Sequence, residues 1–164
     1  MHDVFTKRTQ LGNELRHAGE MHQLYLQYQP IFNLRNQHCE KVEALLRWYH
    51  PEFGTVPPNV FINIAEENGC IIELGEWVFQ QVLSDFPMIS KHFGDIEICI
   101  NLSPIQFAQS ECIAQFITSI TNRGIPGAHF CFEITEGLLL EPSNNVLDNL
   151  SKINEHGIRL ALDD

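Results

Sequence analysis

The sequence predicts an α/β domain organised around a parallel sheet, and three observations on its 164 residues support this class. Strand-like and helix-like segments alternate through the second half of the chain, as they do where helices connect parallel strands. Three of these strands place large apolar residues on one face and small or polar residues on the other. Each of the three also ends in an oxygen-bearing side chain. A (β/α)8 barrel has this pattern, because its strands face helices on one side and the barrel interior on the other.

Residues 1–20 read as a lead-in helix from an upstream domain, and residues 21–164 as the domain itself. The lead-in has a polar helical pattern with an apolar seam at Phe5, Leu11 and Leu15. An eight-stranded barrel needs roughly 200 residues or more. We therefore expect the domain to be incomplete, with the chain ending after about the fifth strand.

The first half of the chain contains two strand-like runs, at residues 24–32 and 39–49, separated by a turn. A loop rich in proline and glycine then leads to a short helix at residues 59–68, which ends at Gly69. A longer helical pattern covers residues 71–86.

The second strand-like run contains the segment Glu43-Ala44-Leu45-Leu46-Arg47-Trp48. Because side chains alternate along a strand, Glu43 and Arg47 share one face of a run that otherwise looks buried. They lie roughly 13 Å apart at about 3.3 Å per residue, too far for a direct ion pair. A buried carboxylate is costly unless it is paired or binds a metal, so Glu43 needs a partner from elsewhere.

The second half of the chain repeats a strand–helix unit. Strands are predicted at residues 96–101, 129–136 and 158–164, with helices at 113–121 and 142–155. We expect the large residues of these strands to face the outer helices: Ile96, Ile98, Ile100, Phe130, Phe132, Ile134, Ile158, Leu160 and Leu162. The small or polar residues would line the interior: Cys99, Asn101, Cys131, Glu133, Ala161 and Asp163.

The last interior residue of each strand would lie at the carboxyl-end mouth of the barrel, where such folds keep their chemistry. Asn101, Glu133 and Asp163 are these residues, at intervals of 32 and 30, and Glu43 takes the same place on its strand. Oxygen ligands from four strand ends suit a hard cation such as Mg²⁺ or Mn²⁺ rather than zinc. Asp164 adds a carboxylate beside Asp163, so two ions could be held for metal-assisted phosphoester hydrolysis.

Each of these residues also has a simpler interpretation. Asn101 could belong to a turn followed by a helix cap at Ser103. Glu133 could be a solvated strand end, and the Asp163-Asp164 pair a solvated terminus. Arg47 could be a surface strand residue. The coincidence of four such side chains, all at strand ends and on the small-residue face, favours the metal site.

Composition narrows the functional classes. The formal charge of −11 argues against a general nucleic-acid or anionic-membrane surface, and an anionic ligand would need metal ions or a specific arginine. No apolar run reaches the ~18 residues of a membrane span. We expect this segment to be cytoplasmic, with any membrane anchor of the parent protein outside it. The five cysteines form no CxxC pair and indicate reduced, buried thiols.

These residues together resemble the EAL domain family, the bacterial cyclic di-GMP phosphodiesterases. The resemblance runs from about Leu24 to Asp164 and is carried by six motifs in order. They are Tyr28-Gln29-Pro30-Ile31, Glu43-Ala44-Leu45-Leu46-Arg47-Trp48, Pro58 with Phe61-Ile62 and Ala65-Glu66, Asn101-Leu102-Ser103, Glu133-Ile134-Thr135-Glu136 and Leu162-Asp163-Asp164.

The resemblance implies a barrel that hydrolyses cyclic di-GMP to linear pGpG with two Mg²⁺ or Mn²⁺ ions. It implies that Glu43, Asn101, Glu133 and Asp163 bind metal, with Asp164 serving the second ion. Catalysis would rest on Glu43, Asp163 and Asp164. Gln29, Leu46 and Arg47 would contact the dinucleotide, with Arg47 at a phosphate.

The resemblance also implies partners: an upstream GGDEF or sensory domain and a homodimer formed through the domain. In the family, a lysine that assists the attacking water and another metal-binding glutamate follow the paired aspartates, beyond the end of this chain. Two alternatives therefore stay open. One is a catalytically inactive EAL domain that acts as a cyclic di-GMP receptor or a protein-interaction module. The other is an enolase-type barrel, against which the arginine and the asparagine ligand speak.

Overall fold

One curved sheet forms the frame of the computed structural model, which describes residues 2–140 and 142–163. Its strand order is β1-β2-β4-β5-β6, and β3 pairs with β2 outside this order. The strands are β1 (Leu24–Phe32), β2 (Cys39–His50), β3 (Gly54–Val56), β4 (Glu97–Asn101), β5 (Phe130–Thr135) and β6 (Arg159–Asp163).

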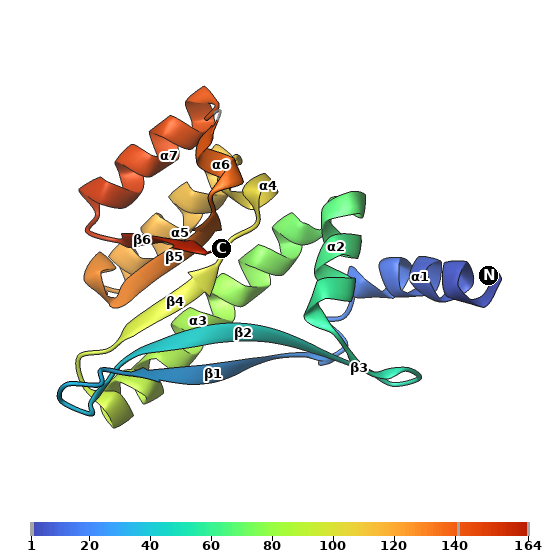
Figure 1. Cartoon of the computed structure of the whole chain (residues 1–164), viewed down its shortest axis with the longest axis horizontal. Coiled ribbons are helices and arrows are strands. Elements are labelled where there is room, and N and C mark those ends of the chain that lie inside the picture. Colours follow the sequence, from blue (N-terminus) through green and yellow to red (C-terminus); the bar gives the residue numbers. More distant parts are fainter. Residues whose placement is uncertain (1, 141, 164) are drawn as a thin grey trace.

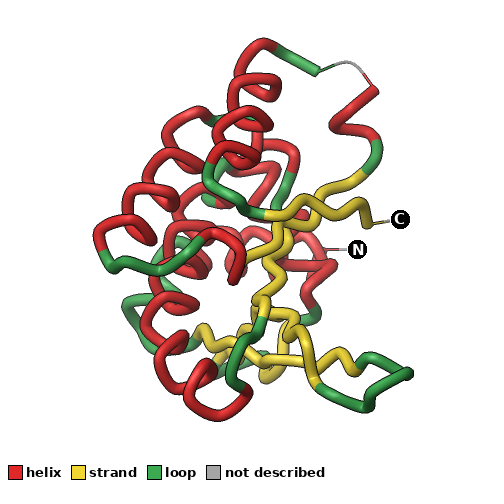
Figure 2. Tube along the Cα trace, turned by 90° about the vertical axis from the view of Figure 1, so that its left-hand side faces the viewer, coloured by secondary structure: helices red, strands yellow, loops and turns green. Residues whose placement is uncertain are grey.

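The strand directions confirm the predicted α/β class. β1 is antiparallel to β2, whereas β2, β4, β5 and β6 run parallel to one another. The helices are α1 (His2–Leu15), α2 (Pro58–Asn68), α3 (Ile71–Phe93), α4 (Pro104–Phe107), α5 (Ser110–Asn122), η1 (Gly127–His129), α6 (Gly137–Leu140) and α7 (Asn144–Glu155). Figure 1 shows the long helices α3, α5 and α7 alongside the parallel strands, and Figure 2 shows most helices on one side of the sheet. This is the curved wall of a partial barrel.

The main core lies between that sheet face and the helices. The large residues predicted to face outward on β4 and β5 are all buried there, where Phe132 packs against Phe79 of α3 and Phe116 of α5. Leu162 is the exception, since 55% of it is exposed. It lies near the end of β6, the last strand in the sheet order, so within the described residues no further strand flanks it on the outer side.

A second core joins α1 to the barrel wall. Leu11 and Leu15 are buried with Trp48 of β2 and Phe61 of α2. The predicted apolar seam is wrong at Phe5, which is 73% exposed. Six residues separate Phe5 from Leu11, and at about 100° per residue this turns Phe5 well away from the buried face.

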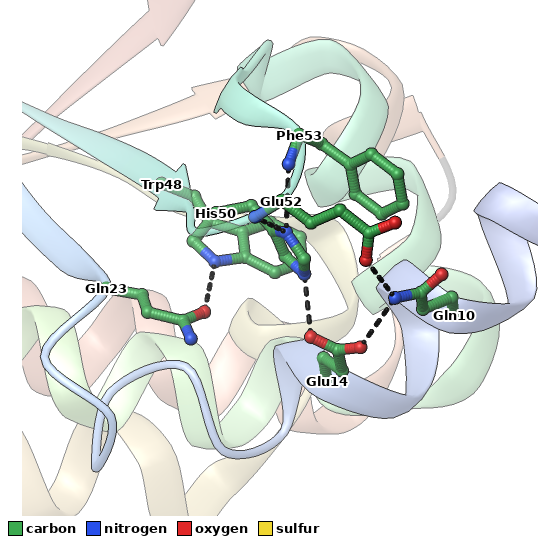
Figure 3. A network of polar contacts seen from close by, with 7 residues as sticks. All are labelled: Gln10, Glu14, Gln23, Trp48, His50, Glu52 and Phe53. Carbon is green, nitrogen blue, oxygen red and sulfur yellow. Dashed lines mark hydrogen bonds and ion pairs between the residues drawn. The ribbon is translucent and has the colours of Figure 1, made fainter.

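A polar network adds a second link between α1 and the end of β2 (Figure 3). Glu14 Oε2 lies 2.7 Å from Nε2 of the buried His50. The other ring nitrogen, Nδ1, accepts from the backbone N–H of Glu52 at 3.1 Å. Since Nδ1 is an acceptor, Nε2 carries the hydrogen and donates it to Glu14. Nearby, Trp48 Nε1 donates to Gln23 Oε1 at 3.0 Å, so both buried rings are fully oriented.

The helices differ from the predicted ones mainly at their ends. α3 continues through Pro87 to Phe93, whereas the pattern predicted an end at Phe86. A proline removes one donor but does not have to end a helix when the following turn packs well, and Ile89 is buried. The short elements β3, α4 and α6 were not predicted, because three or four residues carry no clear periodicity. No helix in the described part of the chain is long and apolar enough to cross a bilayer.

Candidate functional site

Strand register brings the predicted metal ligands together on neighbouring strands, but Glu43 lies within β2, which continues to His50, and not at a strand end as predicted. Asn101 on β4 and Glu133 on β5 are direct register partners. Glu43 on β2 accepts a hydrogen bond from Asn101, with 2.7 Å between Oε1 and Nδ2. Asp163 ends β6, next to β5. Asp164 lies outside the described residues.

The carboxylates of this cluster act on one another. Burial raises the pKa of the Glu133 carboxyl, and repulsion from the Glu43 and Asp163 carboxylates raises that pKa further. Lys41 acts in the opposite direction and lowers that pKa, so the three carboxylates lie close together with one positive charge nearby. Three carboxylates and an amide form the hard oxygen donor set that suits Mg²⁺ or Mn²⁺.

Arg47 is held in place by its own strand pair. Its Nε donates to Gln27 Oε1 at 2.8 Å, and its Nη1 donates to the carbonyl oxygen of Leu46 at 3.0 Å. Gln27 was not singled out in the sequence, although its place on the same face as Gln29 could have suggested it. Gln29 itself is exposed on β1, directly opposite Glu43 in the register. The sheet thus keeps Gln29 near the carboxylates and places Arg47 four residues further along β2.

A cavity of about 310 Å³ opens beside this cluster, between β2 and the helices α2 and α3. Leu46, Arg47 and Asn101 line it, together with Asn59, Leu74 and Gln106. Most of the remaining wall is aliphatic. A ligand in the cavity would meet an apolar surface, the Arg47 guanidinium and the Asn101 amide at the same time, whereas none of the described carboxylates of the cluster lines the cavity.

The loop after β4 is fixed by a capping box that the sequence only partly revealed. Ser103 caps α4 by accepting from the Ile105 N–H at 3.2 Å, and Gln106 Oε1 accepts from the Ser103 N–H at 2.9 Å. The Ser103 hydroxyl also donates to Glu66 on α2 at 2.7 Å. The helix-cap interpretation of this segment is therefore correct for Ser103, yet Asn101 still reaches Glu43. The Ser-x-x-Gln spacing was the available signal for Gln106.

Comparison with known proteins finds one family. The family model described as "EAL domain" matches residues 12–164. The chain is 31% identical over 159 residues to the bifunctional diguanylate cyclase/cyclic di-GMP phosphodiesterase MucR of Pseudomonas aeruginosa, covering 96% of this chain and 23% of MucR. It is 31% identical over 157 residues to the probable cyclic di-GMP phosphodiesterase PdeI of Escherichia coli, covering 94% of this chain and 20% of PdeI.

Solved structures agree with this grouping. The PaMucR phosphodiesterase in complex with c-di-GMP superimposes with a TM-score of 0.86 at 32% identity, over 94% of this chain and 63% of that one. The EAL enzyme Bd1971, bound to cAMP and cyclic di-GMP, gives a TM-score of 0.87 at 28% identity, over 98% of this chain and 45% of that one. The chain thus spans about a fifth of these curated relatives and about half of the solved chains.

Proposed function

Since this chain belongs to the EAL domain family of cyclic di-GMP phosphodiesterases, we propose that it is the front part of a domain that hydrolyses cyclic di-GMP to linear pGpG. The observation that carries the proposal is the cluster on the neighbouring strands. There Glu43 accepts from Asn101 at 2.7 Å, and Glu133 lies in the field of Glu43 and Asp163.

We assign metal binding to Glu43, Asn101, Glu133 and Asp163, with Asp164 serving a second ion. Bound Mg²⁺ or Mn²⁺ would supply an activated water and polarise the phosphate. The chain's own contribution is to hold four oxygen donors on neighbouring strands of one sheet. The hydrogen bond from Asn101 orients the Glu43 carboxylate, and the capping box at Ser103 fixes the segment that carries Asn101.

The dinucleotide would be held by groups that the sheet places around the carboxylates. The planar guanidinium of Arg47 can form two parallel hydrogen bonds with a phosphate, and Gln27 already fixes its orientation. Leu46 contributes to the apolar wall of the cavity, which suits the flat face of a base. Gln29 adds an exposed amide opposite Glu43.

We infer the wider setting from the family. An upstream GGDEF or sensory domain would connect through residues 1–20, and a homodimer would form through the EAL domain. The protein would act in the cytoplasm. The second candidate function is a catalytically inactive receptor for cyclic di-GMP, because Arg47 and the apolar cavity could bind that ligand without hydrolysing it.

The test is the variant Glu43→Gln in the complete protein, with pGpG formation followed in Mg²⁺ and in Mn²⁺. Loss of one metal-binding carboxylate should lower turnover by about 100-fold or more. Glu40→Gln is the matched control, because Glu40 lies on the same strand but is exposed and bonded to the turn through Asn33.

Three results would be decisive. Hydrolysis by the parent protein that Glu43→Gln abolishes and Glu40→Gln preserves supports the phosphodiesterase. Tight binding of cyclic di-GMP without hydrolysis in either metal supports the receptor. Turnover by Glu43→Gln at the parent rate refutes the assigned site.

A further inference from the structure

Two thiols lie side by side inside the barrel wall, one layer below the candidate metal site. Cys99 on β4 and Cys131 on β5 are direct register partners, so their side chains point to the same interior face. Each precedes a candidate metal ligand by two residues, since Asn101 and Glu133 follow on the same strands. Cys99 is 2% exposed and Cys131 is 0% exposed, which keeps other protein thiols away from both.

The geometry suits a covalent bond between the two sulfurs. The ligating atoms of Glu97, Cys99 and Cys131 all lie within 4.8 Å of one another. Neighbouring strands are about 4.8 Å apart, which falls within the roughly 4.4–6.8 Å between Cα atoms that disulfides span. The sulfurs lie within 4.8 Å of each other and would have to approach to the roughly 2.05 Å of an S–S bond, which rotation of the two side chains towards each other favours.

A metal ion is a weaker candidate for the same three groups because of the charges around them. Glu97 is already hydrogen-bonded to the guanidinium of Arg159, and its Oε1 lies 3.6 Å from Lys41 Nζ. Two cations thus neutralise the one carboxylate of the cluster. A divalent ion would add positive charge beside them, whereas a disulfide adds none.

We propose that Cys99 and Cys131 form a reversible disulfide when a peroxide oxidises the protein. The Cys131 sulfur attacks one peroxide oxygen, the O–O bond breaks, and the leaving hydroxide takes the thiol proton as water. The Cys99 sulfur then attacks the resulting sulfenic sulfur, the S–O bond breaks, and a second water leaves with the remaining proton. The two thiols together lose two electrons, and one peroxide is reduced to two waters.

This modification site is independent of the proposed hydrolysis, because it needs only the two strands. It would bridge β4 and β5 directly below Asn101 and Glu133. Neither Cys70 nor Cys112 offers such a pair: Cys70 belongs to the core around Trp48, and Cys112 lies on helix α5.

The experiment treats the fully reduced protein with hydrogen peroxide, unfolds it, blocks free thiols with iodoacetamide and digests it without reductant. Trypsin and a glutamyl endopeptidase together cut after Glu97, Glu111, Arg123 and Glu133. Cys99 then lies on peptide 98–111, Cys112 on peptide 112–123 and Cys131 on peptide 124–133. Each of the three thiols is thereby read separately.

The expected product is peptide 98–111 joined to peptide 124–133, lighter by two hydrogen atoms and separated again by dithiothreitol. Cys112→Ser should leave this product unchanged, and Cys131→Ser should abolish it. The proposal would be overturned if Cys99 and Cys131 were both recovered as carbamidomethyl derivatives. It would also be overturned if both were recovered as separate sulfinic acids. Because the unsubstituted protein gives the decisive peptide map, a poorly folding variant does not affect the outcome.

Discussion

Replacing Gly75 with alanine tests the packing that holds the Asn101 segment in place. A Cβ at position 75 would lie 1.7 Å from Nε2 of Gln106 and 3.0 Å from its Cδ. Gln106 is 4% exposed, and its Oε1 accepts from the Ser103 N–H in the capping box of α4. Alanine therefore requires the end of the Gln106 side chain to shift, and we expect this shift to disrupt that hydrogen bond.

The net cost follows from three opposing effects. Overpacking costs about 1–3 kcal/mol. Leaving a buried polar group without its partner costs about 1–3 kcal/mol more. The better helix propensity of alanine over glycine within α3 returns about 1 kcal/mol. We expect Gly75→Ala to lower the free energy of unfolding by about 3 kcal/mol, which corresponds to roughly 6–12 °C in Tm for a domain of this size.

Urea unfolding and thermal melting of Gly75→Ala, Gln106→Ala and the double variant measure this effect. Removing the Gln106 side chain relieves the clash, so the double variant should be destabilised by less than the sum of the single ones. Gly137→Ala in α6 is the matched control, because an added Cβ there meets no atom within 4 Å. A Gly75→Ala protein as stable as the parent, or strict additivity in the cycle, would refute the packing argument.

Two further predictions concern charge. The pKa of Glu133 is raised in the folded protein by burial and by the carboxylates of Glu43 and Asp163. The ionised form of Glu133 therefore lowers the stability once the pH exceeds the pKa of this residue in the unfolded chain. Glu133→Gln should raise the Tm of the metal-free protein by about 2–4 °C near neutral pH. In calorimetry, the same variant should show a smaller rise in Tm on addition of Mg²⁺ than the parent does. An equal rise in Tm for both proteins would contradict this prediction. Hydrogen bonds from Gln10 and His50 lower the pKa of Glu14 in the folded state. The Glu14 carboxylate therefore stabilises the fold at a pH above its pKa in the unfolded chain. This stabilisation is lost as the pH falls through its pKa in the folded protein. Glu14→Gln should thus melt a few degrees lower at neutral pH, and a gap that persists in acid would exclude the carboxylate as its cause.

Local periodicity in the sequence was enough to predict most of the frame. The alternation of large and small residues on β4 and β5 predicted which face is buried, and Phe132 lies in the core as expected. The same alternation placed Asn101 and Glu133 at one edge of the sheet. This works because side-chain direction along a strand depends only on position, and parallel strands end at the same edge.

Resemblance supplied what periodicity could not. Patterning alone left a metal site, a helix cap and solvated strand ends as competing interpretations, and the order of the motifs around Glu43 and Asn101 favoured the EAL domain family. The match of residues 12–164 to that family confirms the grouping. The roles of individual side chains in hydrolysis stay predictions, to be tested at Glu43.

Contacts between distant residues were decided only by the tertiary structure. Two separate elements are joined by the hydrogen bond from Arg47 to Gln27, by the contact of Gln106 with Gly75 and by the register of Cys99 with Cys131. By itself, the sequence determined which residues form strands and which face of each strand is buried. It also determined which oxygen-bearing side chains lie at or near the ends of those strands. Register, helix docking and side-chain rotation determined which of those groups meet, because they depend on the packing of the whole chain and leave no periodic trace in any one segment.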